Sequence, residues 1–239
     1  MILKKSEGNI DVNKSKLNAE TMKIRINFID DLLASCPADE ELYRTWLAQH
    51  GVDPATIDDE IAHLGIDDTM TKGKTIFLRN DDGEPCIRNY QVRGFFKNAC
   101  RCLKPLPGTY SSDIVANKAV IDRYVFVQEK YIPIHFDGEI SDCQRPLRAS
   151  TLQGERVALS VSESAPAGAW IECTVISLYP GLMDAVREWL AYGQYNGLCQ
   201  WRNSGKGSFL WEELDNHVVK NLPEKKHTLK IGKKMNDDN

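Results

Sequence analysis

Hydrophobic and polar positions alternate along several stretches of the chain. The clearest is MKIRINFI (22–29), where the four apolar residues at even positions fall on one side, as in a half-buried strand. Further strands are predicted from β-branched and aromatic content at 119–129, 130–136, 156–163, 169–178 and 207–214. Thr75 to Arg79 and Cys86 to Arg88 flank an Asp-Asp-Gly turn, which predicts a β-hairpin.

Helical spacing governs most of the remaining segments. YQVRGFFKNACRCLK (90–104) and LMDAVREWLAYG (182–193) each carry one apolar stripe, which is typical of amphipathic helices. The polar side of the first helix carries four cations: Arg93, Lys97, Arg101 and Lys104. This cationic stripe either lies along a phosphate backbone or is an ordinary solvated face. Two short helices are predicted at 38–50 and 54–64, where acidic residues and proline stand at the starts and Gly51 and Gly65 at the ends.

The order of these elements predicts an α+β fold. Strand, helix, strand, strand, helix, strand is the succession of a ferredoxin-like (RRM-like) antiparallel sheet, here with helical and hairpin insertions. We expect a flexible leader at 1–21, a single domain at 22–216 with an acidic helical insertion at 30–68, and a basic C-terminal tail at 217–239.

Charge is distributed unevenly. The chain has 30 Lys and Arg against 34 Asp and Glu, and 11 of those acids, with one arginine, fall between Asp30 and Asp68. The rest therefore carries 29 basic and 23 acidic residues, a balance compatible with nucleic-acid binding on one face. The acidic segment itself is either a protein-docking lobe or a solvated face.

Several functional classes have no signal in the sequence. There is no apolar run of membrane-spanning length and no apolar signal core, and the seven cysteines include only one close pair, Cys100-Arg-Cys102. These features predict a reduced, cytoplasmic protein that does not contact membranes. No P-loop, dinucleotide fingerprint or metal-ligand cluster is present, so we expect no cofactor and no metal.

The stretch 193–211, GQYNGLCQWRNSGKGSFLW, combines glycines, cations and aromatic residues. Glycines permit positive φ and close approach of a ligand, and Arg202 and Lys206 suit a phosphate. Because a helical pattern precedes this loop and an alternating one follows it, we expect a firmly mounted loop that grips a nucleic-acid backbone. The alternative is a long helix-to-strand connection with buried aromatic residues.

GLCQWRNSGKGSF (197–209) resembles the glycine-rich loop of the RAMP superfamily, the repeat-associated RNA-binding proteins of CRISPR systems. The match is carried by Gly197, Arg202, Gly205, Lys206, Gly207 and Phe209. Cys199 departs from it, because many members have a second glycine there. The resemblance implies contact of this loop with an RNA backbone. Residues 144–168 also look like sequences of phage and prophage proteins of undefined function.

Three functions are compatible with these features. The first is non-catalytic RNA binding, alone or beside CRISPR-type protein subunits, with Trp201 or Tyr195 stacking on bases and five cations on phosphates: Arg145, Arg148, Arg156, Arg202 and Lys206. The second is a phage-encoded inhibitor that imitates an RNA-binding subunit and docks on a host complex through 30–68. The third is a metal-independent endoribonuclease, for which His135 and His50 are the catalytic candidates.

Overall fold

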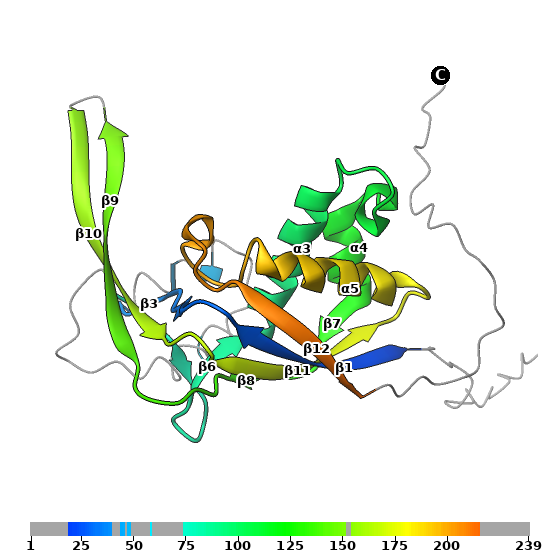
Figure 1. Cartoon of the computed structure of the whole chain (residues 1–239), viewed down its shortest axis with the longest axis horizontal. Coiled ribbons are helices and arrows are strands. Elements are labelled where there is room, and N and C mark those ends of the chain that lie inside the picture. The colour runs from blue at the N-terminus through cyan, green and yellow to red at the C-terminus, as the bar shows by residue number, and fades with distance from the viewer. Residues whose placement is uncertain are drawn as a thin grey trace, which may run out of the picture.

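The computed structural model describes residues 19–39, 44–45, 47–48, 58, 74–151 and 154–215, without the side chains of 147–151, 154–158 and 215. This part of the chain is an α+β structure with several mainly antiparallel sheets and few helices (Figure 1). The expected leader, basic tail and most of the acidic insertion, including the two short helices, lie outside the described residues. No helix within these ranges combines the length and hydropathy needed to cross a membrane.

A four-stranded sheet organises the body of the molecule. Its order is β12 (Phe209–Asp215), β1 (Glu20–Phe28), β11 (Trp170–Ser177), β7 (Val125–Val127), and every neighbouring pair is antiparallel. β1 and β7 run parallel to each other with β11 between them, and β11 and β12 run parallel to each other with β1 between them. The two strand–helix–strand units, β1 to β7 and β11 to β12, are therefore interleaved. This arrangement is compatible with a ferredoxin-like fold.

The helices α3 (Asn89–Leu103), α4 (Asn117–Tyr124) and α5 (Leu182–Ala191) lie on one side of this sheet (Figure 1). The alternation predicted for β1 is confirmed, because Met22, Ile24, Ile26 and Phe28 are all buried. Aromatic rings join the layers. Phe95 of α3 packs on Phe209 of β12 with ring centroids 5.2 Å apart, and Phe96 packs on Trp189 of α5 at 5.8 Å.

A long two-stranded arm projects from the body (Figure 1, left). It consists of β9 (Ser141–Thr151) and β10 (Gly154–Ala165), paired over their whole length from Ser141↔Ser164 to Thr151↔Gly154. The base of β10 belongs to a second sheet with three short strands: β2 (Leu32–Leu33), β3 (Cys36–Pro37) and β4 (Lys74–Ile76).

A third, small sheet contains the hairpin predicted around the Asp-Asp-Gly turn. β5 (Leu78–Arg79) and β6 (Pro85–Arg88) form this hairpin, and β8 (Tyr131–Pro133) pairs with β6. A buried carboxylate connects the second and third sheets. Glu163 accepts hydrogen bonds from the Phe77 amide (2.9 Å) and from Arg79 Nη2 (3.2 Å to Oε2).

Two sequence-based expectations about secondary structure are wrong. Residues 119–124, predicted as the start of a strand, form most of α4, because Val120 and Ile121 pack on the core together with Tyr124, three to four residues later, and packing overrides their β-propensity. Segment 141–151, where no strand was predicted, is strand β9. It was missed because a ribbon that projects from the body has no buried face to produce an alternating pattern.

The two faces of β1 should differ sharply in mutational cost. Ile26 is fully buried, so Ile26→Ala should lower the free energy of unfolding by about 2–5 kcal/mol. Lys23, on the other face, forms an exposed pair with Glu172, and Lys23→Ala should change it by no more than about 0.5 kcal/mol. Urea denaturation measures both. Equal losses of unfolding free energy at the two positions would contradict the assignment of these residues to opposite faces of β1.

Candidate nucleic-acid interface

The glycine-rich loop connects α5 to β12 and contains two short 3-10 turns, η2 (Tyr192–Gln194) and η3 (Arg202–Ser204). Backbone hydrogen bonds fix both of its ends. The Leu198 amide donates to the Gly207 carbonyl (2.9 Å), the Gly207 amide to the Asp31 carbonyl (2.8 Å), and the Ile29 amide to the Ser208 carbonyl (2.9 Å). The loop is thus mounted on the end of β1, the central strand of the main sheet.

Three of the loop's glycines are required by its own packing. A Cβ on Gly193 would lie 2.1 Å from the Phe209 ring, and one on Gly197 would lie 1.9 Å from the Gly207 carbonyl oxygen. Gly207 has φ of +68°, and a Cβ there would meet the Leu198 oxygen at 2.1 Å. These glycines let two segments of the loop approach each other closely, which accounts for the glycine density without any ligand.

The tip of the loop contains two non-glycine residues in the left-handed region, Cys199 (φ 64°) and Trp201 (φ 56°). Such conformations cost an L-residue about 1–2 kcal/mol each. Cys199 occupies the position where the RAMP resemblance expects glycine, and its backbone adopts the conformation that glycine would favour. Burial raises the pKa of the Cys199 thiol to about 12, so it stays protonated at neutral pH.

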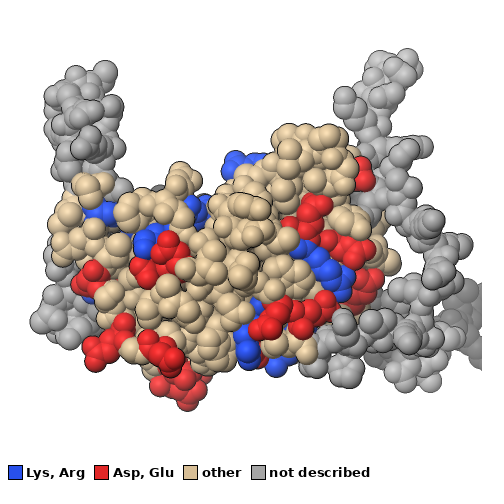
Figure 2. All heavy atoms as spheres, in the orientation of Figure 1, with Lys and Arg blue, Asp and Glu red and all other residues tan. Residues whose placement is uncertain are grey.

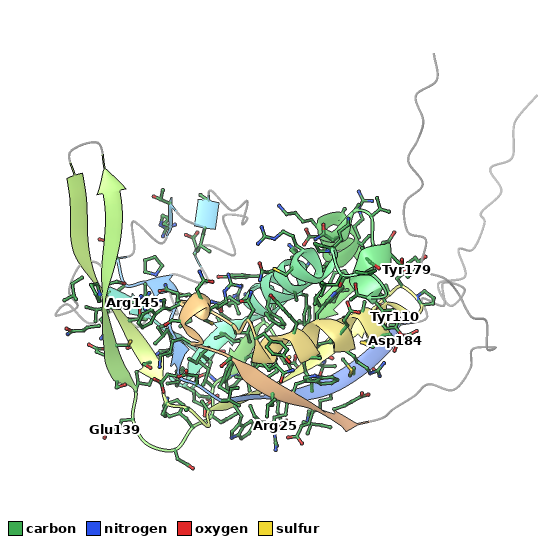
Figure 3. All side chains as sticks on the ribbon, turned by 45° about the horizontal axis from the view of Figure 1, so that its top comes forward. Arg25, Tyr110, Glu139, Arg145, Tyr179 and Asp184 are labelled. Carbon is green, nitrogen blue, oxygen red and sulfur yellow. The ribbon has the colours of Figure 1, made fainter. Side chains whose placement is uncertain are left out.

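A buried arginine joins the arm to the tip of the loop. Arg145 of β9 is 6% exposed and donates to Ser162 Oγ (3.2 Å) and to Gln200 Oε1. Its guanidinium lies 5.3 Å from the centre of the Trp201 ring, which is itself 41% exposed. Figure 3 shows Arg145 at the foot of the arm. Arg145 therefore supports the Trp201 ring from the arm, and the partly exposed indole offers surface for stacking.

Lys206 is held between two carboxylates. Its Nζ lies 2.8 Å from Asp30 Oδ1 and 2.6 Å from Asp31 Oδ2, just beyond the end of β1. The hydrogen bond from Lys206 lowers the pKa of Asp30, and the hydrogen bonds to Asp30 and Asp31 raise the pKa of Lys206. We refer to these three residues as the lysine latch. The latch fastens the loop to β1 and balances the charge of Lys206.

The remaining predicted contacts are spread over the loop and the arm. Arg202 is partly exposed and has no carboxylate partner among the described side chains, and Tyr195 is 74% exposed. Gly205, with φ of +89°, closes η3. Arg148 and Arg156 lie in the distal half of the arm, paired with Val157 and Ala149, but their side chains are outside the described set.

His135, the one predicted catalytic histidine that the structure describes, packs on β11 rather than on this loop. His135 stacks on Trp170 of β11, with ring centroids 4.1 Å apart, and its backbone pairs with that of Trp170. Arg25 lies over the same indole at 4.6 Å. His50 falls outside the described residues. No group of three or more His, Cys, Asp or Glu in the described ranges is placed to hold a metal ion.

Many cations of the body have acidic neighbours. In Figure 2, the blue and red atoms of the described residues lie largely side by side rather than in separate patches. On α3, Arg93 Nη2 lies 3.2 Å from Asp122 Oδ1, and Lys97 pairs with the same oxygen. The cationic stripe expected on this helix therefore serves, at these two positions, to bind α3 to α4.

Sequence reasoning missed three residues on which the loop depends. Asp30 and Asp31 were counted only as part of the acidic segment, and Gln200 was given no role. An acidic pair directly after a strand, in a chain that also carries a glycine-rich cationic loop, is the signal that could have identified the latch. Gln200 gives no comparable signal, because its partner Arg145 depends on how the arm packs against the loop.

Adding a methyl group at Gly193 should destabilise the protein. Gly193→Ala would place Cβ inside the Phe209 ring and should cost about 1–3 kcal/mol of unfolding free energy. Gly94→Ala, in α3 where a Cβ meets nothing within 4 Å, should instead stabilise by about 0.5–1 kcal/mol. Thermal unfolding of the two variants shows whether each substitution lowers or raises the stability of the protein. A neutral Gly193→Ala would mean that the loop is not packed as described.

The lysine latch should be pH-dependent. Because the pKa of Asp30 is lowered and that of Lys206 raised, the latch contributes fully between their ordinary values, about 4 and about 10.4. Its contribution is lost as the pH falls through the lowered Asp30 pKa or rises through the raised Lys206 pKa. Since the three side chains are partly exposed, Lys206→Met should cost only about 0.5–1 kcal/mol at neutral pH.

Urea denaturation of the parent and Lys206→Met, from pH 7 down to pH 3, measures this difference. Lys23→Met, at an exposed pair on the open sheet face, is the control for loss of a lysine. A stability difference that is absent at pH 7, or that persists unchanged at pH 3, would contradict the latch.

The chain matches no protein-family model and no curated protein. Among solved structures it is similar to a chain of the cryo-EM structure of the Type III-B Cmr-beta bound to cognate target RNA, at 11% identity and a TM-score of 0.46, over 82% of this chain and 59% of that chain. It is also similar to a chain of a Type IV-B CRISPR complex, at 11% identity and a TM-score of 0.49, over 92% of this chain and all of that chain. At these TM-scores neither likeness carries a functional argument.

Proposed function

We propose that the chain is a non-catalytic RNA-binding protein that holds an RNA strand at the tip of its glycine-rich loop. One observation carries this proposal. Trp201 is exposed at the tip, supported from the arm by the buried Arg145, and followed directly by Arg202, which has no carboxylate partner among the described side chains. A supported aromatic ring beside an available guanidinium provides a base-stacking surface and a phosphate ligand together.

The arm extends this surface. Arg148 and Arg156 lie in β9 and β10, on the side of Arg145 away from the body, so a strand seated on Trp201 could continue along the arm. Two further arginines there would add phosphate contacts. In this proposal Lys206 acts indirectly, by fixing the loop through Asp30 and Asp31.

The topology supports the RAMP-type assignment within this proposal. The strand order β12-β1-β11-β7, with α3 and α5 on one face, is compatible with a ferredoxin-like unit, and the loop lies between the last helix and the last strand. The resemblance of the loop sequence to the RAMP superfamily implies that RNA would be contacted there. We further propose that the chain works as a subunit of a larger RNA-containing complex. Among the described residues the endoribonuclease alternative has no geometric support, because His135 is stacked on Trp170 and His50 lies outside them.

Removing the stacking ring should weaken RNA binding strongly. Trp201→Ala should reduce affinity for a 30-nucleotide single-stranded RNA of mixed sequence by about 5- to 100-fold, the usual cost of losing one aromatic stacking partner. Arg202→Gln should weaken binding and reduce the slope of log K against log salt by about 0.7, for one lost phosphate contact on a single strand. Fluorescence anisotropy at several salt concentrations measures both effects.

Arg93→Gln is the matched control, because this arginine is paired with Asp122 on α3 and should leave affinity unchanged. Thermal unfolding of each variant separates lost contacts from lost structure. Undetectable binding of the parent protein at low salt would end the proposal, as would equal affinities for parent, Trp201→Ala and Arg202→Gln.

A further inference from the structure

A second surface stands out at the connection between α3 and α4. Among the described residues, eight large hydrophobic side chains are exposed, and three of them lie in this single connection: Leu106 (51%), Tyr110 (44%) and Val115 (53%). We call these three residues the α3–α4 patch. In Figure 2 the top of the molecule, over this connection, is largely free of charged atoms. Grouped exposed apolar side chains are typical of protein-interaction sites.

The patch is built on a fixed backbone. Glu188 of α5 accepts hydrogen bonds from the Tyr110 amide (2.7 Å), the Ser111 amide (3.1 Å) and Ser111 Oγ (2.6 Å). Ser111 is fully buried, and Trp189 Nε1 donates to its Oγ (2.9 Å). A glutamate from a neighbouring helix thus anchors the 3-10 turn η1 (Tyr110–Asp113) and sets the direction of Tyr110.

Both sides of the turn are fixed as well. Thr109 Oγ1 donates to the Leu106 carbonyl (2.9 Å) and accepts from the Ser112 amide (3.1 Å). Ile114 is fully buried, and Lys104 Nζ donates to the Val115 carbonyl (2.8 Å). Because the connection is already ordered, a partner that covers the patch would pay little conformational entropy on binding.

The charge around the patch is positive. Arg101, Lys104 and Lys118 stand against Asp113 and against Glu188, which is hydrogen-bonded to Tyr110 and Ser111, a balance of +1 when the two carboxylates are subtracted from the three cations. Arg101 donates to the amide oxygen of Asn98 and Lys104 to a backbone carbonyl, so both cations have neutral partners. Lys97 and Arg93, one and two turns before Arg101 on α3, are paired with Asp122 instead.

We propose that the α3–α4 patch is a docking site for an acidic amphipathic segment of another protein, in which a row of apolar side chains is flanked by carboxylates. The apolar row would cover Leu106, Tyr110 and Val115, and the carboxylates would meet Arg101 and Lys104. Nucleic acid fits this surface poorly, because only one of its three side chains, Tyr110, gives bases a stacking partner. This inference is independent of the RNA-binding proposal, which rests on the loop at 193–211.

A designed peptide tests the proposal on the full-length protein. The probe is an 18-residue helical peptide with leucines at i, i+3, i+4 and i+7 and glutamates beside them, labelled for fluorescence anisotropy. We expect saturable binding that weakens with salt and at least about fivefold in Leu106→Ser/Val115→Ser, because apolar burial is lost. Lys104→Gln should also weaken it, and a peptide with lysines in place of the glutamates should bind at least about fivefold more weakly.

Leu210→Ser is the matched control, because Leu210 of β12 is as exposed as Val115 and lies outside the patch. It should leave peptide binding unchanged, while RNA affinity should be the same in all the patch variants. The proposal is overturned if the peptide does not bind, if the lysine peptide binds equally well, or if the patch variants bind like the parent. It is also overturned if those variants instead abolish self-association or binding to anionic vesicles, which would assign the patch to a second copy or to lipid.

Discussion

The placement of β1 between β11 and β12 is the constraint on which the rest of the structure depends. Its buried residues form one side of the main core, and its hydrogen bonds on both edges hold the two strand–helix–strand units together. The same strand then leads directly into Asp30 and Asp31, which fasten the glycine-rich loop. The glycine-rich loop is therefore fastened to a strand of the main core, so the position of the loop follows from the packing of the sheet.

How much of this fold could be predicted depends on whether an element buries one face. The sequence alone was sufficient for β1, α3, α5, β11 and β12, because each shows the period of its own structure against a single core. α4 was misassigned because its short β-branched run fits either period and only contact with α3 decides between them. β9 was not predicted because its partner is another strand of a projecting ribbon, and such pairing leaves no hydrophobic pattern.

The position of the candidate site could be predicted from the sequence, but the roles of several of its residues could not. Glycine density and cations identified the loop, but the glycines at 193, 197 and 207 serve close packing of the loop on itself. The cations of the site also differ in what they contact. Arg145 and Lys206 are each committed to partners far away in sequence, and charge alone could not reveal those partners. What separates Arg202 from them is the absence of any carboxylate partner among the described side chains, a property that only the folded structure shows.

The contacts of Arg145 have a mechanical consequence. One guanidinium joins β9, β10 and the tip of the loop, so the arm and Trp201 share a common pivot. From Arg145 to Thr151 the strand continues for about 20 Å, at roughly 3.3 Å per residue. A tilt of roughly 5° about this pivot would displace the end of the arm by about 2 Å over that length. A small tilt at Arg145 would thus become a larger displacement at the far end of the arm.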